Sequence, residues 1–307
     1  MQLVVSLNPA VDVEWRVDTV QWEEKNQVLM ERRWPGGKGI NVARWLAHLG
    51  GNPHLLIPLG GRNGDELKAG LREQGLKIST ITLREASRAN VVVTTAAGKQ
   101  LRFNPLGPKL SARKWSEVLA TATKHLDRAN LMILSGALPR GVPATAYAQL
   151  LKIANRRSAK AILDCDGAAL RAGIAAKPFL TKPNEFELEQ WSRKPLRTES
   201  AVVRAARALA DATQGWVLVS RGPKGALLAG HGISLACRAP VVRVRNTIGA
   251  GDALVAAVAA HIDKAPEEWL RWGVATGTAA TECTAGELAT LSRIKKLHDS
   301  TRLRVTR

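Results

Sequence analysis

The sequence predicts an α/β protein built on a mostly parallel β-sheet. Short runs rich in Val, Ile and Leu alternate with longer segments in which apolar residues recur at helical spacing. Apolar residues make up 45% of the 307 positions and charged residues 23%, which is typical of a globular protein with a substantial core. Strands buried on both faces and joined by helical crossovers produce this alternation.

The alternation extends over most of the chain. Strands are expected at residues 3–7, 54–59, 131–135, 161–164, 179–181 and 216–220. Helices are expected at residues 40–49, 66–74, 144–155, 168–176 and 201–212, and again after residue 252 at 253–262, 267–281 and 288–298. Glycines at 60, 61 and 64 follow a strand at the wrong spacing for a nucleotide loop, so they predict a simple turn.

Two regions break the alternation. Residues 13–34 place spaced Trp and Val among charged residues, and NVVVTTAAGKQLRF at 90–103 predicts a hairpin that turns at Ala97-Gly98. Such strands could form a small sheet beside the large one, and covering a cleft as a lid is one use for it. No repeat, low-complexity segment or linker divides the chain, so residues 1–307 are expected to form a single domain.

Charge and cysteine content restrict the partners and the compartment. The 45 Lys and Arg against 26 Asp and Glu give a formal net charge of +19, which attracts anions such as nucleic acids, membrane surfaces or phosphorylated metabolites. The basic run near residues 293–307 is better explained as a solvated surface than as a nucleic-acid contact. Three separated cysteines, the lack of a secretion signal and the lack of a membrane-spanning run indicate a cytoplasmic protein.

The segment NTIGAGDALVAAV, residues 246–258, is the first candidate site. The small residues Gly249, Ala250 and Gly251 would let backbone N–H groups face a phosphate at the start of the following helix. Asp252 would enter the same space and could accept the proton of an attacking hydroxyl. The alternative is that the helix dipole alone favours an acidic residue there and that the small residues only allow close packing. The motif by itself does not separate the two interpretations.

A second candidate is PGGKGINVARWLAHLGG, residues 35–51. Its glycines precede another helix start able to hold an anion, to which Lys38 adds charge and Asn41 a neutral donor. A flexible turn is the alternative, and two such clusters in one chain weaken it. Neither a P-loop nor a standard dinucleotide fingerprint is present.

Five segments taken in order, NPAVD, PGGKGINVARWLAHLGG, SGALPRGVP, KPNEFEL and NTIGAGD, resemble the PfkB (ribokinase-like) carbohydrate kinases. The resemblance is strongest to the phosphosugar branch that contains 1-phosphofructokinase, tagatose-6-phosphate kinase and the minor 6-phosphofructokinase. It implies a doubly wound α/β domain with a small β-sheet lid formed by about residues 13–34 and 88–104. It also implies ATP and Mg²⁺, a phosphorylated ketohexose as acceptor, and a homodimer formed through the lids.

The resemblance also assigns roles on the acceptor side. Asp252 corresponds to the catalytic base, with the amides of Gly249, Ala250 and Gly251 as the anion hole. Asp12, taken to end the first strand, corresponds to the acid that holds sugar hydroxyls; without a ligand it would be a turn residue. The acceptor segment is completed by Gly37, Lys38, Asn41, Ser135, Arg88 and Asn90. Arg88 could grip a sugar phosphate bidentately, and an exposed loop arginine is the alternative.

On the nucleotide side, Asn184 and Glu187 match an N-x-x-E motif that organises Mg²⁺ through water. A helix cap with a surface Glu is the alternative for this pair. The remaining assignments are Lys182 near the phosphates, Ser220, Gly222, Lys224 and Gly225 in the nucleotide loop, and Gly277 beside the adenine. A turn between strands would explain the loop glycines equally well.

The expected reaction is therefore phosphate transfer from MgATP to a ketohexose phosphate, with fructose 1-phosphate as the first candidate. Lys38 favours the 1-phosphofructokinase and tagatose-6-phosphate kinase types, whereas WLAHLGG and LRF are similar to the minor 6-phosphofructokinase. Tagatose 6-phosphate and fructose 6-phosphate are the alternatives. Two further interpretations stay open: a kinase for an unphosphorylated sugar or nucleoside, and a non-catalytic nucleic-acid-binding protein. The charge is compatible with nucleic acid, but the paired motifs argue against it as the partner.

Overall fold

A ten-stranded sheet forms the centre of the protein in the computed structural model, which describes residues 1–306. Its strands, in spatial order, are β14 (Leu303–Val305), β13 (Ile233–Cys237), β12 (Ala226–Gly230), β11 (Trp216–Ser220), β10 (Leu180–Thr181), β9 (Lys160–Asp164), β8 (Leu131–Ser135), β1 (Gln2–Val5), β4 (Pro53–Gly60) and β5 (Lys77–Leu83). The strands from β11 to β5 are parallel, and β12, β13 and β14 are antiparallel additions. The expectation of a mostly parallel sheet is confirmed.

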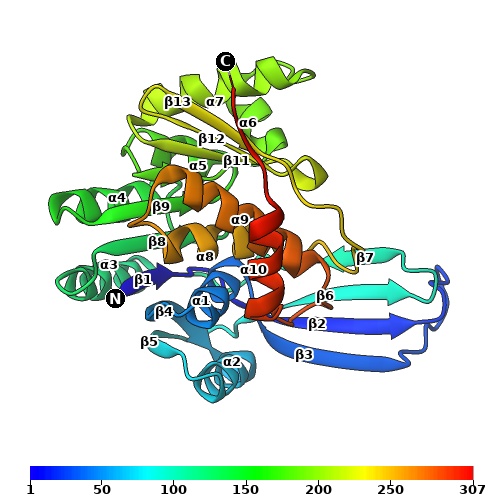
Figure 1. Ribbon diagram of the computed structural model, residues 1–307. Helices are drawn as coiled ribbons and strands as arrows, with labels where there is room; N and C mark the ends of the chain where they lie inside the picture. The colour runs from blue at the N-terminus through cyan, green and yellow to red at the C-terminus, as the bar shows by residue number, and fades with distance from the viewer. Residues whose placement is uncertain (307) are drawn as a thin grey trace.

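Helices cover both faces of this sheet (Figure 1). One face carries α1 (Lys38–His48), α2 (Gly61–Glu73), α8 (Ala250–Ala260), α9 (Pro266–Thr281) and α10 (Leu291–Ser300). The other face carries α3 (Ala112–Leu126), α4 (Ala146–Arg156), α5 (Gly167–Ile174), α6 (Glu185–Ser192) and α7 (Glu199–Thr213). The fold is therefore doubly wound.

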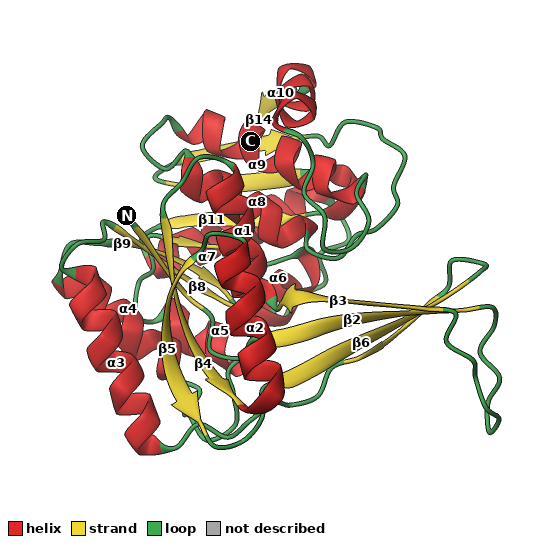
Figure 2. Ribbon diagram, turned by 90° about the horizontal axis from the view of Figure 1, so that it is seen from below, coloured by secondary structure: helices red, strands yellow, loops and turns green. Residues whose placement is uncertain are grey.

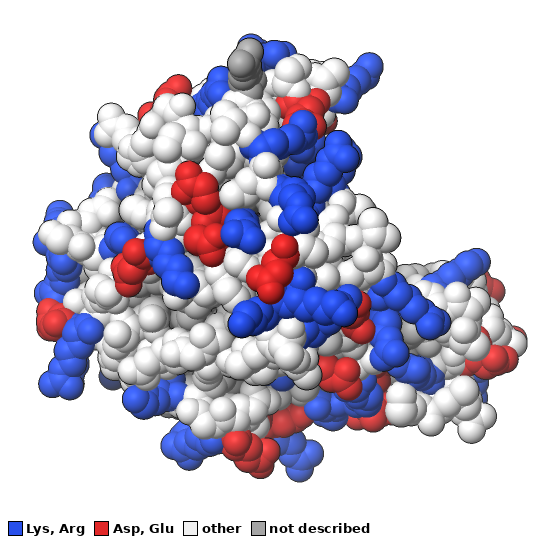
Figure 3. Space-filling view, in the orientation of Figure 1, with Lys and Arg blue, Asp and Glu red and all other residues white. Residues whose placement is uncertain are grey.

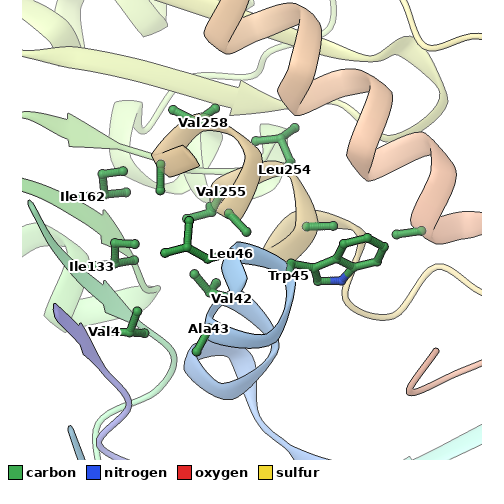
Figure 4. Packing of buried hydrophobic residues seen from close by; sticks show 14 of the residues in the cluster. Val4, Val42, Ala43, Trp45, Leu46, Ile133, Ile162, Leu254, Val255 and Val258 are labelled. Carbon is green, nitrogen blue, oxygen red and sulfur yellow. The ribbon is translucent and has the colours of Figure 1, made fainter. Parts of the chain in front are cut away.

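The two hydrophobic cores follow from the two-residue period of the strands. In β1, Val4 belongs to the core beneath α1 and α8, whereas Leu3 and Val5 belong to the core beneath the opposite helices. Figure 4 shows the first core, where side chains of α1 and α8 meet the sheet residues Val4, Ile133 and Ile162. Because α1 and α8 pack directly against each other, their first turns reach the same edge of the sheet.

A second, four-stranded sheet projects from this body (Figures 1 and 2). Its order is β3 (Met30–Gly36), β2 (Ala10–Val17), β6 (Arg88–Thr95) and β7 (Gln100–Phe103), with β2 and β6 parallel. The expected small sheet and the hairpin between β6 and β7 are confirmed, and Gly98 adopts a positive φ of 76° in that turn.

The structure corrects the sequence-based description of residues 60–64. These residues are not a simple turn, because α2 begins at Gly61 directly after β4. A Cβ on Gly60 would lie 2.2 Å from the carbonyl oxygen of Glu85, and Gly61 has a φ of 60°. The glycines are thus required by a sharp strand-to-helix junction that passes close to the neighbouring backbone.

The basic C-terminal run has the solvated surface that the sequence predicted, since Lys295, Lys296, Arg302 and Arg304 are exposed. Leu303–Val305 form β14, which pairs with β13 and covers the edge of the large sheet. Arg304 contacts Glu199 at the start of α7. Strand pairing therefore fixes the backbone of this segment while its basic side chains face solvent.

Candidate active site

Polar side chains gather where the parallel strands of the large sheet end. Ser135 and Asp164 are the last residues of β8 and β9, and Lys182 follows β10. β1 lies between β8 and β4, so the chain reverses the direction in which it adds strands at this point. Ligands of open α/β sheets bind in the crevice at such a switch point. Here the crevice is a cavity of about 660 Å³, called the polar cleft below.

The start of α8 forms one wall of the polar cleft. Gly249 precedes the helix with a φ of 80°, a left-handed conformation that a side chain would strain. The N–H groups of the first helical turn lack partners inside the helix, and Gly249 and Gly251 line the cleft. Asp252 lies in that first turn, since α8 begins at Ala250 rather than at 253. The arrangement can hold an anion beside a carboxylate.

Asp252 is buried, and its pKa is raised. Its side chain is 6% exposed, and Nδ2 of Asn41 in α1 donates a hydrogen bond of 2.9 Å to its Oδ2. Burial raises the pKa of Asp252 to about 6, and the nearby carboxylate of Asp164 acts in the same direction. Lys38, Asn41 and Lys182 oppose this rise. A carboxylate with such a pKa can accept a proton near neutral pH.

The structure adds Asp164, which the sequence analysis did not single out. Asp164 is 1% exposed, and its Oδ1 lies 3.1 Å from Nζ of Lys182 and 3.6 Å from Nζ of Lys38. The Ser135 hydroxyl donates to Oδ2 at 3.2 Å. Burial alone would raise the pKa of Asp164, but the two ammonium groups lower it below its usual value. An acidic residue that ends a buried strand at the site edge was the available signal in the sequence.

The start of α1 forms the opposite wall. Gly37 precedes the helix with a φ of 93° and lines the cleft together with Lys38 and Asn41, as the sequence predicted. The carboxylate of Asp164 raises the pKa of Lys38 well above its usual value, so this lysine stays charged. A Cβ on Gly39 would lie 2.5 Å from Cβ of Ser6, which explains the glycine by close packing of α1 against the end of β1.

The small sheet contributes Asp12 and Asn90 to the lining of the cleft, and these residues are paired neighbours on β2 and β6. Asp12 does not end the first strand as expected but lies inside β2, because the chain crosses into the second sheet directly after Pro9. Asn90 Nδ2 donates to Asp12 Oδ1 at 2.8 Å, and burial raises the pKa of Asp12.

Arg88 lies at the same corner of the cleft and is not an exposed loop arginine. It begins β6, and its two terminal nitrogens donate to the carbonyl oxygens of Pro105 and Asn8, both at 2.9 Å. Its Nε is buried, with no hydrogen-bond partner within residues 1–306. The Arg88 guanidinium is therefore held by the backbone, and its Nε–H and one N–H on each terminal nitrogen are not used in these bonds.

A further cation was not anticipated from the sequence. Arg102 lines the polar cleft from β7, opposite Val92 and therefore on the face of the small sheet that carries Asp12 and Asn90. Its guanidinium donates to the neutral amide of Gln100 at 2.9 Å. The sequence segment LRF, residues 101–103, is similar to the minor 6-phosphofructokinase, but this similarity does not predict a role for Arg102. The pairing of β7 with β6 places this arginine in the cleft.

An apolar pocket of about 410 Å³ adjoins the polar cleft. The two cavities share Ser220, Thr247 and Gly251, so they meet at the start of α8. The expected residues Gly222, Gly225 and Gly277 line the apolar pocket, together with Ala250. Its other walls include Val241, Val242, Val244, Leu254 and Val274.

Close packing explains why two of these positions are glycines. A Cβ on Gly225, whose φ is 89°, would lie 2.0 Å from the carbonyl oxygen of Cys237. A Cβ on Gly277 would lie 3.1 Å from the carbonyl oxygen of Ala250. Small residues therefore keep the loop after β11 and the helix α9 close to the pocket.

Lys224 differs from its neighbours in the loop, because it lines neither cavity. Its side chain is 65% exposed, and Nζ lies 3.3 Å from Oε2 of Glu185. Lys182, by contrast, reaches the cleft and is 5% exposed. Of these two lysines, only Lys182 reaches the polar cleft in this conformation.

Asn184 and Glu187 form a complete capping box at the start of α6. Asn184 Oδ1 accepts from the Glu187 backbone N–H at 2.8 Å, and Glu187 Oε2 accepts from the Asn184 N–H at 2.9 Å. Both residues also line the polar cleft. Over residues 1–306, no three His, Cys, Asp or Glu side chains are grouped so that they could hold a metal ion by themselves.

None of the helices in residues 1–306 has the length and apolar character needed to cross a membrane.

Comparison with known proteins agrees with this geometry. The family model described as pfkB family carbohydrate kinase matches residues 4–291. The chain is 34% identical over 252 residues to the ATP-dependent 6-phosphofructokinase isozyme 2 of Escherichia coli (strain K12), covering 80% of this chain and 81% of that protein. It is 35% identical over 266 residues to a 1-phosphofructokinase of Xanthomonas campestris pv. campestris, covering 85% and 83%.

Solved structures give the same result. Phosphofructokinase-2 from Escherichia coli in complex with potassium superimposes with a TM-score of 0.92 at 30% identity, covering 97% of this chain and 98% of that one. A ribokinase from Thermotoga maritima, 20% identical with a TM-score of 0.80, covers 97% and 99% and shares the fold. The ribokinase-like fold expected from the sequence is confirmed. The chain belongs to the pfkB family of carbohydrate kinases, and its reaction is phosphate transfer to a sugar hydroxyl.

Proposed function

We propose that this kinase transfers the γ-phosphate of ATP to a phosphorylated ketohexose, with fructose 1-phosphate as the first candidate acceptor. Tagatose 6-phosphate and fructose 6-phosphate are the alternatives. The observation that carries the proposal is the position of Asp252, a buried carboxylate with a pKa of about 6 beside the start of α8. It lies where an apolar pocket meets a cleft with four cationic side chains, Lys38, Arg88, Arg102 and Lys182.

Each part of the site has a distinct task in this reaction. The apolar pocket receives the nucleoside, and the amides of Gly249, Ala250 and Gly251 hold the phosphate that is transferred. Asp252 accepts the proton of the attacking hydroxyl, which then forms a bond to the γ-phosphorus while the bond to the β-phosphate oxygen breaks. Asp12 and Asn90 hold other hydroxyls of the sugar.

The phosphate already on the acceptor requires cations away from Asp252. Arg88 lines the cleft, and each of its terminal nitrogens keeps one N–H beyond its bond to the backbone. Among the described residues, Arg102 donates to the neutral Gln100. Arginine suits this task because its planar donors match phosphate oxygens. The relatives named 1-phosphofructokinase and 6-phosphofructokinase isozyme 2 support a phosphosugar acceptor without separating the candidates.

Mg²⁺ is proposed at the edge of the cleft near Asn184 and Glu187. Mg²⁺ keeps several waters and is held by one or two carboxylates together with substrate phosphates, so a dedicated cage is not needed. One oxygen of each side chain is engaged in the capping box, which favours contact through water. When bound, Mg²⁺ would neutralise negative charge on the phosphates of ATP.

The test measures ADP formation with fructose 1-phosphate, fructose 6-phosphate, tagatose 6-phosphate, free fructose and ribose as acceptors. Turnover of one phosphosugar that Asp252→Asn abolishes is expected. Turnover of only an unphosphorylated sugar, or of none of the five, would contradict the proposal.

The small sheet is proposed to act as a lid and as the contact between two copies of the chain. Six exposed large apolar side chains lie on this sheet or its adjoining loops: Trp22, Val28, Leu29, Met30, Phe103 and Leu106. Light scattering after gel filtration should give twice the monomer mass for the wild type. Leu29→Asp should lower that mass, with Leu291→Asp on α10 as the control.

A further inference from the structure

We infer that Asp164 is a positioning residue that anchors Lys182 on the donor side and Lys38 on the acceptor side of the site through one buried carboxylate oxygen. This inference rests on the proposed function for what the two lysines contact. The geometry of the three side chains is independent of which sugar is the acceptor.

Asp164 forms ion pairs with two ammonium groups at once. Its Oδ1 lies 3.1 Å from Nζ of Lys182 and 3.6 Å from Nζ of Lys38, while Oδ2 accepts the Ser135 hydroxyl. Two lysines in one partly buried cleft repel each other, and a carboxylate between them compensates both charges. Because Asp164 is 1% exposed at the end of β9, the central sheet fixes its position.

The two lysines belong to different walls of the cleft. Nζ of Lys182 lies 3.8 Å from the place that a Cβ would take on Gly251, next to the amides at the start of α8. Lys38 is the first residue of α1, three positions before Asn41. Asp164 therefore couples a cation beside the transferred phosphate to a cation beside the acceptor segment.

Asp164 also shares its charge environment with Asp252. Asp252 is surrounded by Lys38 from α1, Asp164 from β9 and Lys182 after β10, and the α9 residues at the adjoining pocket are uncharged. Asp164 raises the pKa of Asp252, whereas the two lysines lower it. Glu187 and Asp166 also act on Lys38. Asp164 thus influences the base through its charge as well as through the lysines that it holds.

The experiment separates charge from position with two variants. Asp164→Asn removes the charge, and Asp164→Glu keeps the charge but moves the carboxylate by one methylene. Cys165→Ala is the matched control, because Cys165 adjoins Asp164 and is buried in the core on the other side of the site. The probe is the side-chain Cε ¹³C resonance of Lys38 in unliganded protein, identified by its loss in Lys38→Met. The kinetic measurement is kcat/KM with the best acceptor.

In Asp164→Asn, the titration midpoint of Lys38 should move to lower pH, because Asp164 is the main group that raises the pKa of this lysine, and kcat/KM should fall by about 100-fold as the lysines lose their anchor. In Asp164→Glu, the retained charge should keep the Lys38 midpoint above that of Asp164→Asn, while kcat/KM falls at least about 10-fold. Cys165→Ala should match the wild type in both measurements.

A Lys38 midpoint in Asp164→Asn equal to that of the wild type would overturn the inference, and so would wild-type kcat/KM in Asp164→Glu. If Asp164→Asn does not fold, the Glu variant still decides whether the position of the carboxylate matters. If the wild type turns over no sugar, the proposed function fails, and the titration of the unliganded protein still tests the role of Asp164.

Discussion

Asp252 combines two demands that conflict in a folded protein. The carboxylate must be buried beside the helix start to meet a hydroxyl, yet burial disfavours its charged form and raises its pKa to about 6. Asn41 donates a hydrogen bond to it, and Lys38 and Lys182 supply positive charge. The residue therefore has a proton affinity suited to a base at some cost to the stability of the fold.

This proton affinity predicts the dependence of activity on pH. Only the deprotonated form of Asp252 can accept a proton, so kcat/KM should rise about tenfold per pH unit below about 6 and level off above it. Initial rates between pH 4.5 and 8, with the coupling enzymes in excess, would measure this limb. A profile flat from pH 5 to pH 8 would contradict the role of Asp252.

The same group predicts an unusual effect on stability. The pKa of Asp252 is raised in the folded state from 3.8 to about 6, so the folded protein binds more protons in this interval and loses stability as the pH rises through it. Asp252→Asn should therefore increase the free energy of unfolding at pH 8 by about 2 to 3 kcal/mol while abolishing activity.

Urea unfolding at pH 8 and at pH 3.5 would test this effect. The gain should largely disappear at the lower pH, where the wild-type residue is protonated in the folded state and mostly protonated in the unfolded state. Asp263→Asn on the exposed loop after α8 provides the control and should change stability little at either pH. A loss of stability in Asp252→Asn at pH 8 would contradict the expectation.

At the level of the elements, helix starts supply most of the site. α1, α6 and α8 all begin at the polar cleft, each after a different strand, and they bring Lys38, Glu187 and Asp252 there. Within residues 1–306, the starts of α1 and α8 have no side-chain cap, so their first N–H groups are available to a ligand. At α6, the residues proposed for Mg²⁺ also hold the helix start, so a substitution there can disturb structure and chemistry together.

The capping box allows these two roles to be separated. Asn184→Ala removes the side chain that accepts from Glu187 N–H and should lower stability by about 1 kcal/mol. Glu187→Gln keeps an oxygen that can accept from Asn184 N–H, so stability should change by less than about 0.5 kcal/mol. The loss of its charge should nevertheless reduce activity and raise the Mg²⁺ concentration needed for half-maximal rate.

Urea unfolding and Mg²⁺ titrations of the initial rate would provide the two measurements. A Glu187→Gln enzyme with wild-type activity at low Mg²⁺ would restrict Glu187 to its role in the cap.

Across the whole molecule, positive charge accompanies a site that must bring two anions together. Lys and Arg side chains are spread over the body and the projecting sheet, with acidic side chains among them (Figure 3). The formal net charge is +19. A field of this kind raises the local concentration of anionic ligands and weakens as salt is added.

The KM values for ATP and for the phosphosugar should therefore increase several-fold between about 0.02 M and about 0.3 M salt, whereas kcat should change little. Steady-state kinetics at fixed pH would measure both parameters. A KM for the phosphosugar that is independent of salt would show that the contacts within the cleft, rather than the overall charge, determine binding.

The sequence by itself determined the secondary structure of the buried strands and the type of chemistry. Continuous apolar runs such as residues 131–135 and 216–220 become strands covered on both faces, because local hydrophobicity is sufficient to require that burial. It did not reveal β5, whose half-exposed Ser and Thr residues interrupt the apolar pattern at the sheet edge, and the 15-residue helix α3 was also missed. The glycine-rich segments before α1 and α8 were found because tight turns and close approach restrict the residue type.

Only the tertiary structure decided which side chains meet. Asp164 gains its two lysines from α1 and from the segment after β10, and Arg102 reaches the cleft through strand pairing in the small sheet. Asp12 belongs to that sheet rather than to the first strand, and Lys224 turns away toward Glu185. Sequence patterns report burial and backbone conformation near each residue, whereas these contacts join segments that lie far apart along the chain. Their charges and proton affinities depend on distances that arise only when the two sheets and the helix starts come together.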